Sequence, residues 1–285
     1  LNTSTIRFKP KDGRSDLKFL RHWLDGSEFR GQITKLVTGS AQQNFGPTHL
    51  KALRISVPPL EEQRRIAAIL DQAETLRTQR RTALALLDSL TQSLFLDMFG
   101  EPVANPKGWP IKHFGDVGTN EDYKRIAVKS SDRGSRKGQY AYYGASGIID
   151  WVDEFLFDGT RLLVGEDGAN LAARATPVAY MAYGKYWVNN HAHVIAENSQ
   201  ANLRYLEYFI EQIDLKPYLS GSAQPKLNRA NLDRIPVALP PIDLQQTFAT
   251  RIAAIEALKT THRHALAALD ALFASLQQRA FAGQL

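Results

Sequence analysis

Residues 58–100 read PPLEEQRRIAAILDQAETLRTQRRTALALLDSLTQSLFLDMFG. Two prolines open this stretch, a glycine closes it, and residues 60–99 between them contain neither. Proline suits the first turn of a helix, and Glu61 and Glu62 follow at the positive end of the helix dipole. At ~1.5 Å per residue, such a helix would be about 60 Å long. We therefore predict one uninterrupted helix here, longer than a compact core requires.

A second copy of this stretch begins 182 residues later, at Pro240-Pro241, and runs to the C-terminus. In both copies apolar residues recur three and four positions apart, which is the spacing of an apolar stripe along a helix. The simplest way to bury both stripes is to pack the helices on each other as an antiparallel coiled coil. The side chains expected to pack this pair are Ile66, Leu70, Leu84, Leu87, Leu94, Phe248, Ile252, Leu266, Leu269 and Leu276.

Polar side chains interrupt both stripes at matched positions. Arg77 and Arg80 stand in the first copy where Lys259 and His262 stand in the second. Single polar residues in the seam of a coiled coil fix its register and its partner. A duplicated helix of this length therefore indicates a spacer or scaffold rather than two ordinary core helices.

The composition is that of a folded protein with a modest excess of basic residues. The 285 residues are 44% hydrophobic and carry a net charge of +6. This excess favours a polyanion partner, although charge alone leaves nucleic acid at even odds. The chain has no cysteine and no apolar run long enough to span a membrane. We therefore expect a cytoplasmic protein with no membrane partner.

The segment between the two helices has a different character. It is rich in Gly and Tyr and contains short runs of β-branched and aromatic residues, which predict strands, at 139–143, 147–152, 161–164, 177–181 and 186–188. A helical pattern follows at 203–210. We predict an α+β globule over residues 101–239.

The repeat extends backwards beyond the prolines. Gly39-Ser40-Ala41-Gln42 recurs as Gly221-Ser222-Ala223-Gln224, and a helical pattern precedes each copy, at residues 16–24 in the first. Residues 50–57 read as a short strand leading into the first proline pair. We expect residues 1–57 to be the C-terminal part of a second globule, whose counterpart of residues 109–187 is absent.

These motifs, in this order, resemble the specificity (S) subunit of type I restriction–modification enzymes. The resemblance covers essentially the whole chain. It rests on the strand–Pro-Pro–helix junctions at 55–63 and 237–242, on Tyr142-Tyr143-Gly144-Ala145-Ser146-Gly147-Ile148-Ile149-Asp150, on the turn at 165–169 and on Val188-Asn189-Asn190-His191-Ala192-His193-Val194.

The resemblance implies an α+β fold in which target-recognition domains, mixed α/β globules, alternate with long helices that pair as an antiparallel two-helix coiled coil. Residues 1–57 would be the C-terminal part of the first recognition domain and 58–100 the first conserved helix. Residues 101–239 would be the second recognition domain and 240–285 the second conserved helix.

The resemblance also implies a non-catalytic reader of double-stranded DNA that needs no cofactor. Each recognition domain would read one half of a bipartite, asymmetric target, and the paired helices would set the gap between the halves. Two methyltransferase subunits would dock on the helices, and a restriction (translocase) subunit would join them.

Side chains suited to DNA contact gather in three segments, because Lys and Arg bind phosphates and polar side chains read base edges. The densest basic segment holds Lys124, Arg125, Lys129, Ser130, Arg133, Arg136 and Lys137, beside Tyr142 and Tyr143. Its alternative role is a solvated surface loop. A polar loop holds Ser222, Gln224, Lys226 and Asn228, echoed by Ser40, Gln42 and Asn44; it suits DNA contact and turn formation equally. Asn189, Asn190 and His191 complete the set.

Three features that look catalytic weigh less. His191 and His193 are spaced for a metal on a strand face, but no third ligand is evident, so we assign no metal. Residues 166–168 favour a turn over a Mg²⁺ site, and the nuclease-like triplet at 214–216 is common by chance. The main alternative to a DNA reader is a coiled-coil scaffold or oligomerisation protein with a protein-binding globule.

Overall fold

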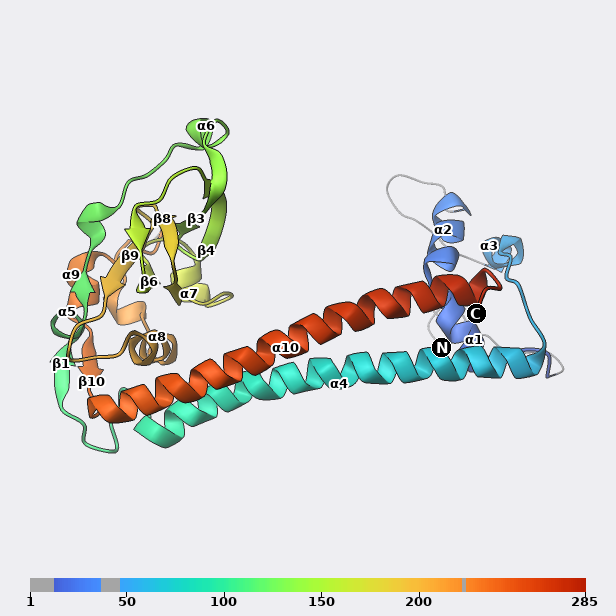
Figure 1. The fold of residues 1–285 in the computed structure, drawn as a ribbon, viewed down its shortest axis with the longest axis horizontal. Coiled ribbons are helices and arrows are strands. Elements are labelled where there is room, and N and C mark those ends of the chain that lie inside the picture. The colour runs from blue at the N-terminus through green and yellow to red at the C-terminus, as the bar shows by residue number, and fades with distance from the viewer. Residues whose placement is uncertain (1–12, 37–46, 222–223) are drawn as a thin grey trace. The chain divides into compact units, whose positions relative to one another are not determined.

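The computed structural model describes residues 13–36, 47–221 and 224–285 (Figure 1). The chain divides into two compact units. The first unit comprises Leu1–Asp88 and Ala257–Leu285, and the second unit comprises Ser89–Glu256. Each unit therefore contains one part of both long helices. Among the described residues, no helix is long and apolar enough to cross a membrane.

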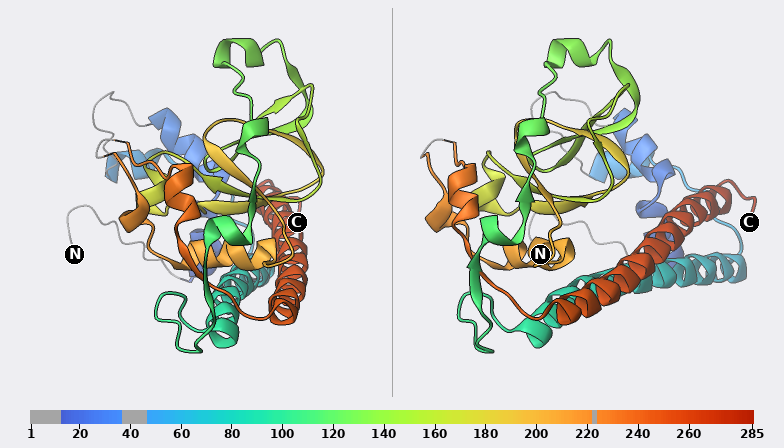
Figure 2. Two further views of the ribbon diagram at one scale, coloured as in Figure 1. Left: turned by 90° about the vertical axis from the view of Figure 1, so that its left-hand side faces the viewer. Right: turned by 60° about the vertical axis from the view of Figure 1, so that its left-hand side comes forward.

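The two predicted long helices are present as α4, Leu60–Phe99, and α10, Ile242–Phe281. In the first unit, Arg77 of α4 bonds to Asp270 at 2.6 Å, whereas Asp88, further along α4, bonds to Lys259 at 2.9 Å. Residue numbers that rise along α4 thus fall along α10. The predicted antiparallel pair is confirmed, and the two ribbons run alongside each other in every view (Figures 1 and 2).

The packing of the helix pair differs along its length. In the first unit, Ile66 and Leu70 are buried with Phe273 and Phe281, and Leu276 packs against this cluster. In the second unit, Phe248 and Ile252 are fully buried, and Leu94 packs against their cluster. The other four predicted packing residues, Leu84, Leu87, Leu266 and Leu269, lie in the first unit and, like Leu94 and Leu276, are only partly buried.

Equivalent residues of the two repeats meet each other in the first unit. Arg80 Nη1 lies 3.2 Å from His262 Nδ1, and these two residues are 182 positions apart. The same shift converts the Arg77–Asp270 ion pair into the Lys259–Asp88 ion pair. This part of the helix pair therefore has a local two-fold axis that passes between Arg80 and His262.

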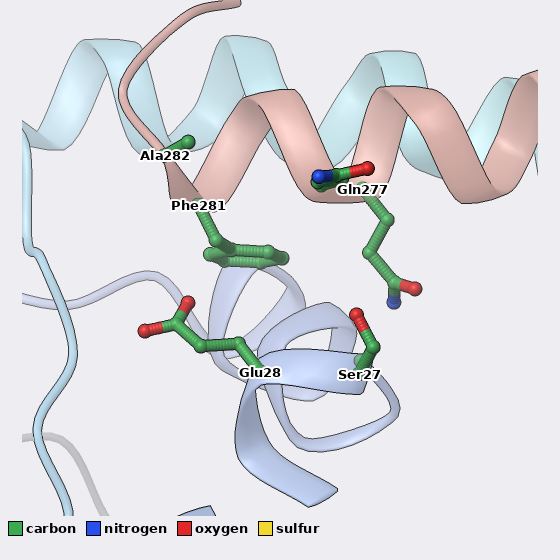
Figure 3. Close-up of a pocket in the computed structure, with 7 residues that line it drawn as sticks. Ser27, Glu28, Gln277, Phe281 and Ala282 are labelled. Carbon is green, nitrogen blue, oxygen red and sulfur yellow. The ribbon is translucent and has the colours of Figure 1, made fainter. Parts of the chain in front are cut away.

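Three short helices accompany the long helices in the first unit: α1 at Leu17–Leu24, α2 at Ser27–Leu36 and α3 at Pro47–Ala52. The Asp16 carboxylate caps α1, because it accepts the amide hydrogens of Lys18 and Phe19, both at 2.9 Å. The Phe19 ring then packs against the Phe281 ring of α10, with their centroids 5.2 Å apart. Figure 3 shows Ser27 and Glu28 of α2 facing α10 across a cavity of about 360 Å³.

The strand predicted at residues 50–57 is wrong. Pro47–Ala52 is helical, and residues 53–59 form no regular element. The Gln32 carboxamide of α2 takes the position of a neighbouring strand, because it accepts from the Arg54 amide at 2.8 Å and donates to the Arg54 carbonyl at 2.6 Å. A side chain thus satisfies backbone groups that a sheet would otherwise satisfy.

The second unit contains the predicted α+β globule together with parts of both long helices, and each predicted strand overlaps an observed one. Its elements, in chain order, are β1 Ile111–His113, α5 Phe114–Val117, β2 Thr119–Asn120, η1 Asp122–Lys124, α6 Ser130–Arg133, β3 Lys137–Gly144, β4 Gly147–Val152, β5 Phe157–Asp158, β6 Arg161–Gly165, α7 Asn170–Ala173, β7 Ala179–Ala182, β8 Lys185–Val188, β9 Ala192–Ala196, α8 Leu203–Gln212, η2 Lys216–Tyr218, α9 Arg229–Asp233 and β10 Pro236–Ala238.

These strands form two four-stranded sheets and a small ribbon. One sheet has the order β2-β9-β6-β7 with antiparallel neighbours, and the other has the order β4-β3-β8-β5, in which β3 and β8 are parallel. β1 and β10 pair as the ribbon. Leu162, Leu163 and Val164 of β6 are all fully buried, which explains their continuous apolar run. The core lies around this strand.

In each unit, a buried glutamine of the long helix bonds to the residue that caps a short helix and to the first proline of the proline pair. In the first unit, Gln63 accepts from the Asp16 amide at 2.8 Å and donates to the Pro58 carbonyl at 2.7 Å. In the second unit, Gln245 accepts from the Asn202 amide at 2.9 Å and donates to the Pro240 carbonyl at 2.8 Å. Asp16 and Asn202 cap α1 and α8, so both repeats use the same device.

Candidate nucleic-acid interface

Four loops of the second unit converge at one edge of its sheets. The Glu166 amide donates to the His191 carbonyl at 2.8 Å, and the Gly168 amide donates to the Pro225 carbonyl at 3.0 Å. The Leu227 amide donates to the Glu166 carbonyl at 2.8 Å. We name this edge the loop edge. Its four loops are the β3–β4 turn at 144–147, residues 166–169 after β6, the β8–β9 turn at 189–191 and the loop at 224–228.

Glycines allow the loops of this edge to approach each other closely. A Cβ atom on Gly165 would lie 2.8 Å from the Ala145 carbonyl oxygen, which is too close for any side chain. Gly168 has a φ of +112°, a conformation that glycine adopts without strain. The motifs at 142–150, 165–169 and 188–194, which are separate in the chain, therefore meet in space.

Four exposed polar side chains lie on the loop edge. Asn190, His191, Gln224 and Lys226 are all exposed. Carboxylates beneath them orient two of the four, because His191 Nδ1 lies 2.8 Å from Asp167 and Lys226 Nζ lies 3.1 Å from Glu166. Amide, imidazole and ammonium groups of this kind are the groups that read base edges and bind phosphates.

A buried ion network lies under the loop edge. Arg125 donates to Glu166 at 2.7 Å and lies 3.3 Å from Asp122, which is 2.6 Å from His193 Nδ1. Burial alone would raise the pKa of Asp122, but hydrogen bonds from His193 and its other partners lower that pKa below its usual value. The pKa of Glu166 is likewise lowered, because Arg125, His193 and Lys226 outweigh burial.

The distances within this network also meet the first requirement of a metal site. Ligand atoms of Asp122, Glu166 and His193 all lie within 4.8 Å of one another. However, the Arg125 guanidinium already bonds to both carboxylates, and a divalent cation among these groups would face its positive charge. We therefore describe the cluster as an ion network and assign no metal to it.

Most cations of the predicted basic segment have acidic partners. Lys124 bonds to Glu121 at 2.5 Å, Arg136 contacts Asp153 and Glu154, and Lys137 and Arg133 contact Asp150. Arg125 belongs to the buried network, so its predicted contact with DNA conflicts with its position. Among the described residues, Lys129 has no carboxylate partner, and it is exposed beside Ser130, the first residue of α6 (Figure 1).

The two tyrosines predicted beside this segment face the interior. Tyr142 is 2% exposed, packs with Val152 and Trp187, and accepts from the Val128 amide at 2.9 Å. Its assignment to the DNA surface is corrected to the core, because the burial pattern of β3 places its ring inward. Tyr143 is partly buried against Tyr180, and burial raises its pKa.

The remaining predicted residues have mixed positions. Asn189 is buried and accepts from the His191 amide at 2.8 Å, so it shapes the turn. Asn228 caps α9 by accepting from the Asn231 amide at 2.9 Å. Ser40, Gln42, Asn44 and Ser222 lie outside the described residues. In the triplet at 214–216, Asp214 accepts from the Lys216 amide at 3.0 Å, which is the geometry of a turn.

Sequence reasoning missed the residues that support the exposed loops. Asp122 lies in an unremarkable stretch, and its partner His193 is 71 positions away. The buried Gln245 was also missed, although its recurrence 182 positions after Gln63 was a usable signal.

Polar side chains thus gather on loops at one edge of a sheet scaffold, in a chain with an antiparallel helix pair. The family model of the type I restriction modification DNA specificity domain matches residues 1–85 and 106–270. The chain therefore belongs to this family.

Relatives of known class support this membership. The chain is 34% identical over 147 residues to a putative type I restriction enzyme specificity subunit of Haemophilus influenzae, an alignment that covers 52% of this chain and 37% of that protein. It is 24% identical over 262 residues to the putative MjaX specificity subunit of Methanocaldococcus jannaschii, covering 85% of this chain and 61% of that protein. The chain thus spans less than two thirds of the length of both relatives.

A solved structure shares the fold. The S subunit of a type I restriction–modification system from M. genitalium superimposes with a TM-score of 0.63 at 18% identity, and the match covers 94% of this chain and 73% of that one. The mixed helix-and-sheet architecture with long helices is therefore that of an S subunit.

Proposed function

We propose that the chain is the sequence-specific DNA-recognition subunit of a type I restriction–modification complex. It reads an asymmetric, bipartite double-stranded target and docks methyltransferase subunits, and a restriction subunit joins this assembly. The observation that carries the proposal is the loop edge, found in a chain of the specificity-domain family. The chain itself catalyses no step, and its partners supply the chemistry.

The loop edge suits base reading in the major groove. The carboxamides of Asn190 and Gln224 offer a donor and an acceptor on one group, as adenine requires. Lys226 and His191 are held by carboxylates below them, so their orientation is set before DNA arrives. Lys129, exposed and without a carboxylate partner among the described residues, suits a phosphate.

The long helices present an apolar surface suited to a protein partner, and the repeat duplicates this surface. Leu76, Leu258 and Leu272 of the first unit are 41%, 51% and 49% exposed. Leu258 stands 182 positions after Leu76, and Leu272 stands 182 positions after Leu90, which is 48% exposed in the second unit. Large apolar side chains left in solvent at repeated positions mark an interaction surface. Duplication of this surface supports two methyltransferase subunits.

Apolar and charged residues of these helices each repeat every seven positions, and the two sets occupy different positions of the heptad. Leu258, Ala265 and Leu272 follow one heptad position, whereas Glu256, Arg263 and Asp270 follow another. The two positions flank the seam on opposite sides of a coiled coil. One side of the pair is therefore apolar and suited to a protein partner, and the other carries charge.

The test is the methylation pattern written by the assembled complex. The full chain is combined with its methyltransferase subunits, and modified positions in a DNA library are mapped by sequencing. We expect one bipartite motif with a fixed spacer. Methylation without sequence preference would refute the proposed function.

Substitutions separate reading from docking. Asn190→Ala with Gln224→Ala should lower methylation of the preferred sites by about 10–100-fold, the effect of losing a good base contact, and leave assembly intact. Leu76→Asp with Leu258→Asp should prevent assembly. Gln246→Ala and Thr82→Asp, at exposed positions of the long helices, are the matched controls and should change neither.

A further inference from the structure

His193 of β9 is a buried histidine whose two ring nitrogens both have partners. Its side chain is 1% exposed. Nδ1 lies 2.6 Å from the Asp122 carboxylate, and Nε2 lies 2.7 Å from the main-chain carbonyl oxygen of Leu227. A carbonyl oxygen only accepts hydrogen bonds, and so does an ionised carboxylate. Both ring nitrogens must therefore donate, which requires the doubly protonated imidazolium.

Asp122 is the ionised partner that this arrangement needs. Its carboxylate also accepts from the Val194 amide at 2.8 Å and from the Asn120 side chain at 3.0 Å, and it lies 3.3 Å from Arg125. A proton on Asp122 would displace one of these donors. The alternative, a neutral imidazole beside a protonated carboxyl, is thus disfavoured by the surroundings of Asp122.

Other charged groups around His193 come from the segments that pack on it. Glu166, after β6, lies 3.9 Å from Nδ1 and is bonded by Arg125 after η1 and by Lys226 of the 224–228 loop. His191, on the β8–β9 turn, faces Asp167. Asp122 and Glu166 are thus the two carboxylates that face Arg125, Lys226 and His193.

The bond from Nε2 reaches the loop that carries Gln224 and Lys226. The Leu227 amide donates to the Glu166 carbonyl at 2.8 Å, and the Leu227 carbonyl accepts from His193. Leu227 is fully buried. Both backbone groups of this residue are therefore anchored, and the anchor from His193 needs a proton on Nε2.

We propose that His193 is a positioning residue for DNA reading: its imidazolium clamps Leu227 and so fixes the loop that presents Gln224 and Lys226. It does not touch DNA. This proposal rests on the proposed function. Replacing His193 removes its bond to Leu227, so sequence discrimination should decline, whereas low-salt binding to any sequence should decline less.

The first experiment reads the protonation state without DNA. The full chain, labelled with ¹⁵N-histidine, is examined by two-bond nitrogen–proton correlation at about pH 7, and His193 is assigned through His193→Gln. We expect both ring nitrogens of His193 to have the shifts of nitrogens that carry a proton. His264, exposed on α10, is the site of the control variant. An unprotonated nitrogen on His193 would overturn the proposal.

The second experiment uses the complex with methyltransferase subunits and compares binding to the preferred duplex with binding to a scrambled duplex. His193→Gln should lower the ratio of the two affinities at least about tenfold, since a charged hydrogen bond is lost. His264→Gln is the control. Unchanged discrimination in His193→Gln would overturn the proposal.

Asp122→Asn covers the case in which His193→Gln does not fold, because it removes the carboxylate partner of Nδ1 and keeps the histidine. It should lower discrimination in the same direction, and unchanged discrimination in both variants would overturn the proposal. If the wild-type complex never discriminates, the proposed function fails and the DNA-reading role fails with it. The nitrogen shifts would then still decide whether His193 clamps Leu227.

Discussion

The junctions at which α1 and α8 dock on the long helices share one design and differ in chemistry. Both use a buried glutamine, and both place an aromatic ring of the docked helix on equivalent phenylalanines: Phe19 on Phe281 at 5.2 Å and Tyr205 on Phe99 at 4.8 Å. In the second unit the surroundings are aromatic, with Tyr208 5.3 Å from Phe248.

In the first unit a charged cluster lies where the second unit has rings. The buried His22 lies 2.8 Å from Asp71, which also bonds to Lys18 and Arg21. The position equivalent to Asp71 in the second repeat is Ala253. The comparison teaches that the glutamine and the ring contact define the docking geometry, whereas the remaining side chains decide how each junction responds to conditions.

The largest expected effect comes from removing a fully buried ring of the second junction. Phe248→Ala should destabilise the second unit by about 3–5 kcal/mol, the range for a buried phenylalanine, because Phe95, Phe99 and Tyr208 lose their contacts with it. Hydrogen exchange of α8 amides measures the loss. Leu272→Ala, an exposed apolar position, should cost about 0.5 kcal/mol or less. A loss below about 1 kcal/mol for Phe248→Ala would contradict the packing described.

A smaller and matched effect should come from the two glutamines. Gln63→Ala and Gln245→Ala should each cost about 2–3 kcal/mol, because each leaves a buried capping amide and a proline carbonyl without a partner. Urea unfolding, monitored by hydrogen exchange of the α1 and α8 amides, measures the stability loss in both variants. Clearly unequal losses would show that the two glutamines contribute differently to the stability of their units.

The smallest effect is a difference in the response to acid. Hydrogen bonding from Lys18, opposed by burial and aided by His22, lowers the pKa of Asp71. This stabilisation is present above the usual aspartate pKa of about 3.9 and is lost as the pH falls through the lower folded value. Burial raises the pKa of Glu207 on α8, so its contribution is instead present in acid and is lost as the pH rises.

Exchange measured on α1 and α8 between about pH 7 and pH 3 checks this difference. The α1 amides should lose about 1 kcal/mol of protection relative to α8, a modest value because Lys18 and Arg21 are exposed. Asp71→Asn should abolish the difference. Parallel loss of protection in both helices would contradict it.

The long helices were predictable because their signals are local. Proline, an unbroken run of helix formers and Gly100 mark α4, and the repeat marks α10. Residues 50–57 were misread because Gln32, 22 positions from Arg54, satisfies the backbone there, and a strand pattern carries no trace of such a partner.

The candidate site was predicted only in part, because residue type is a local signal and contacts between distant segments are not. Asn190, His191, Gln224 and Lys226 were recognisable by residue type, and the structure brings them to one edge. Tyr142 and Arg125 were misplaced, because residue type does not reveal which side of β3 faces inward or that Glu166 lies 41 positions from Arg125 but next to it in space. The clamp at His193 depends on contacts between distant segments, which spacing along the chain does not encode.

The contact between Phe95 and Phe248 has a consequence for chain entropy. Arg80 and His262 are 182 residues apart, and closing so long a loop in an unfolded chain costs conformational freedom that grows with the logarithm of its length. Once the second unit is folded, Phe95 and Phe248 are held together and both helices leave that unit already paired. The folded second unit thereby shortens the loop that must close, so pairing of Arg77 with Asp270 costs less conformational freedom.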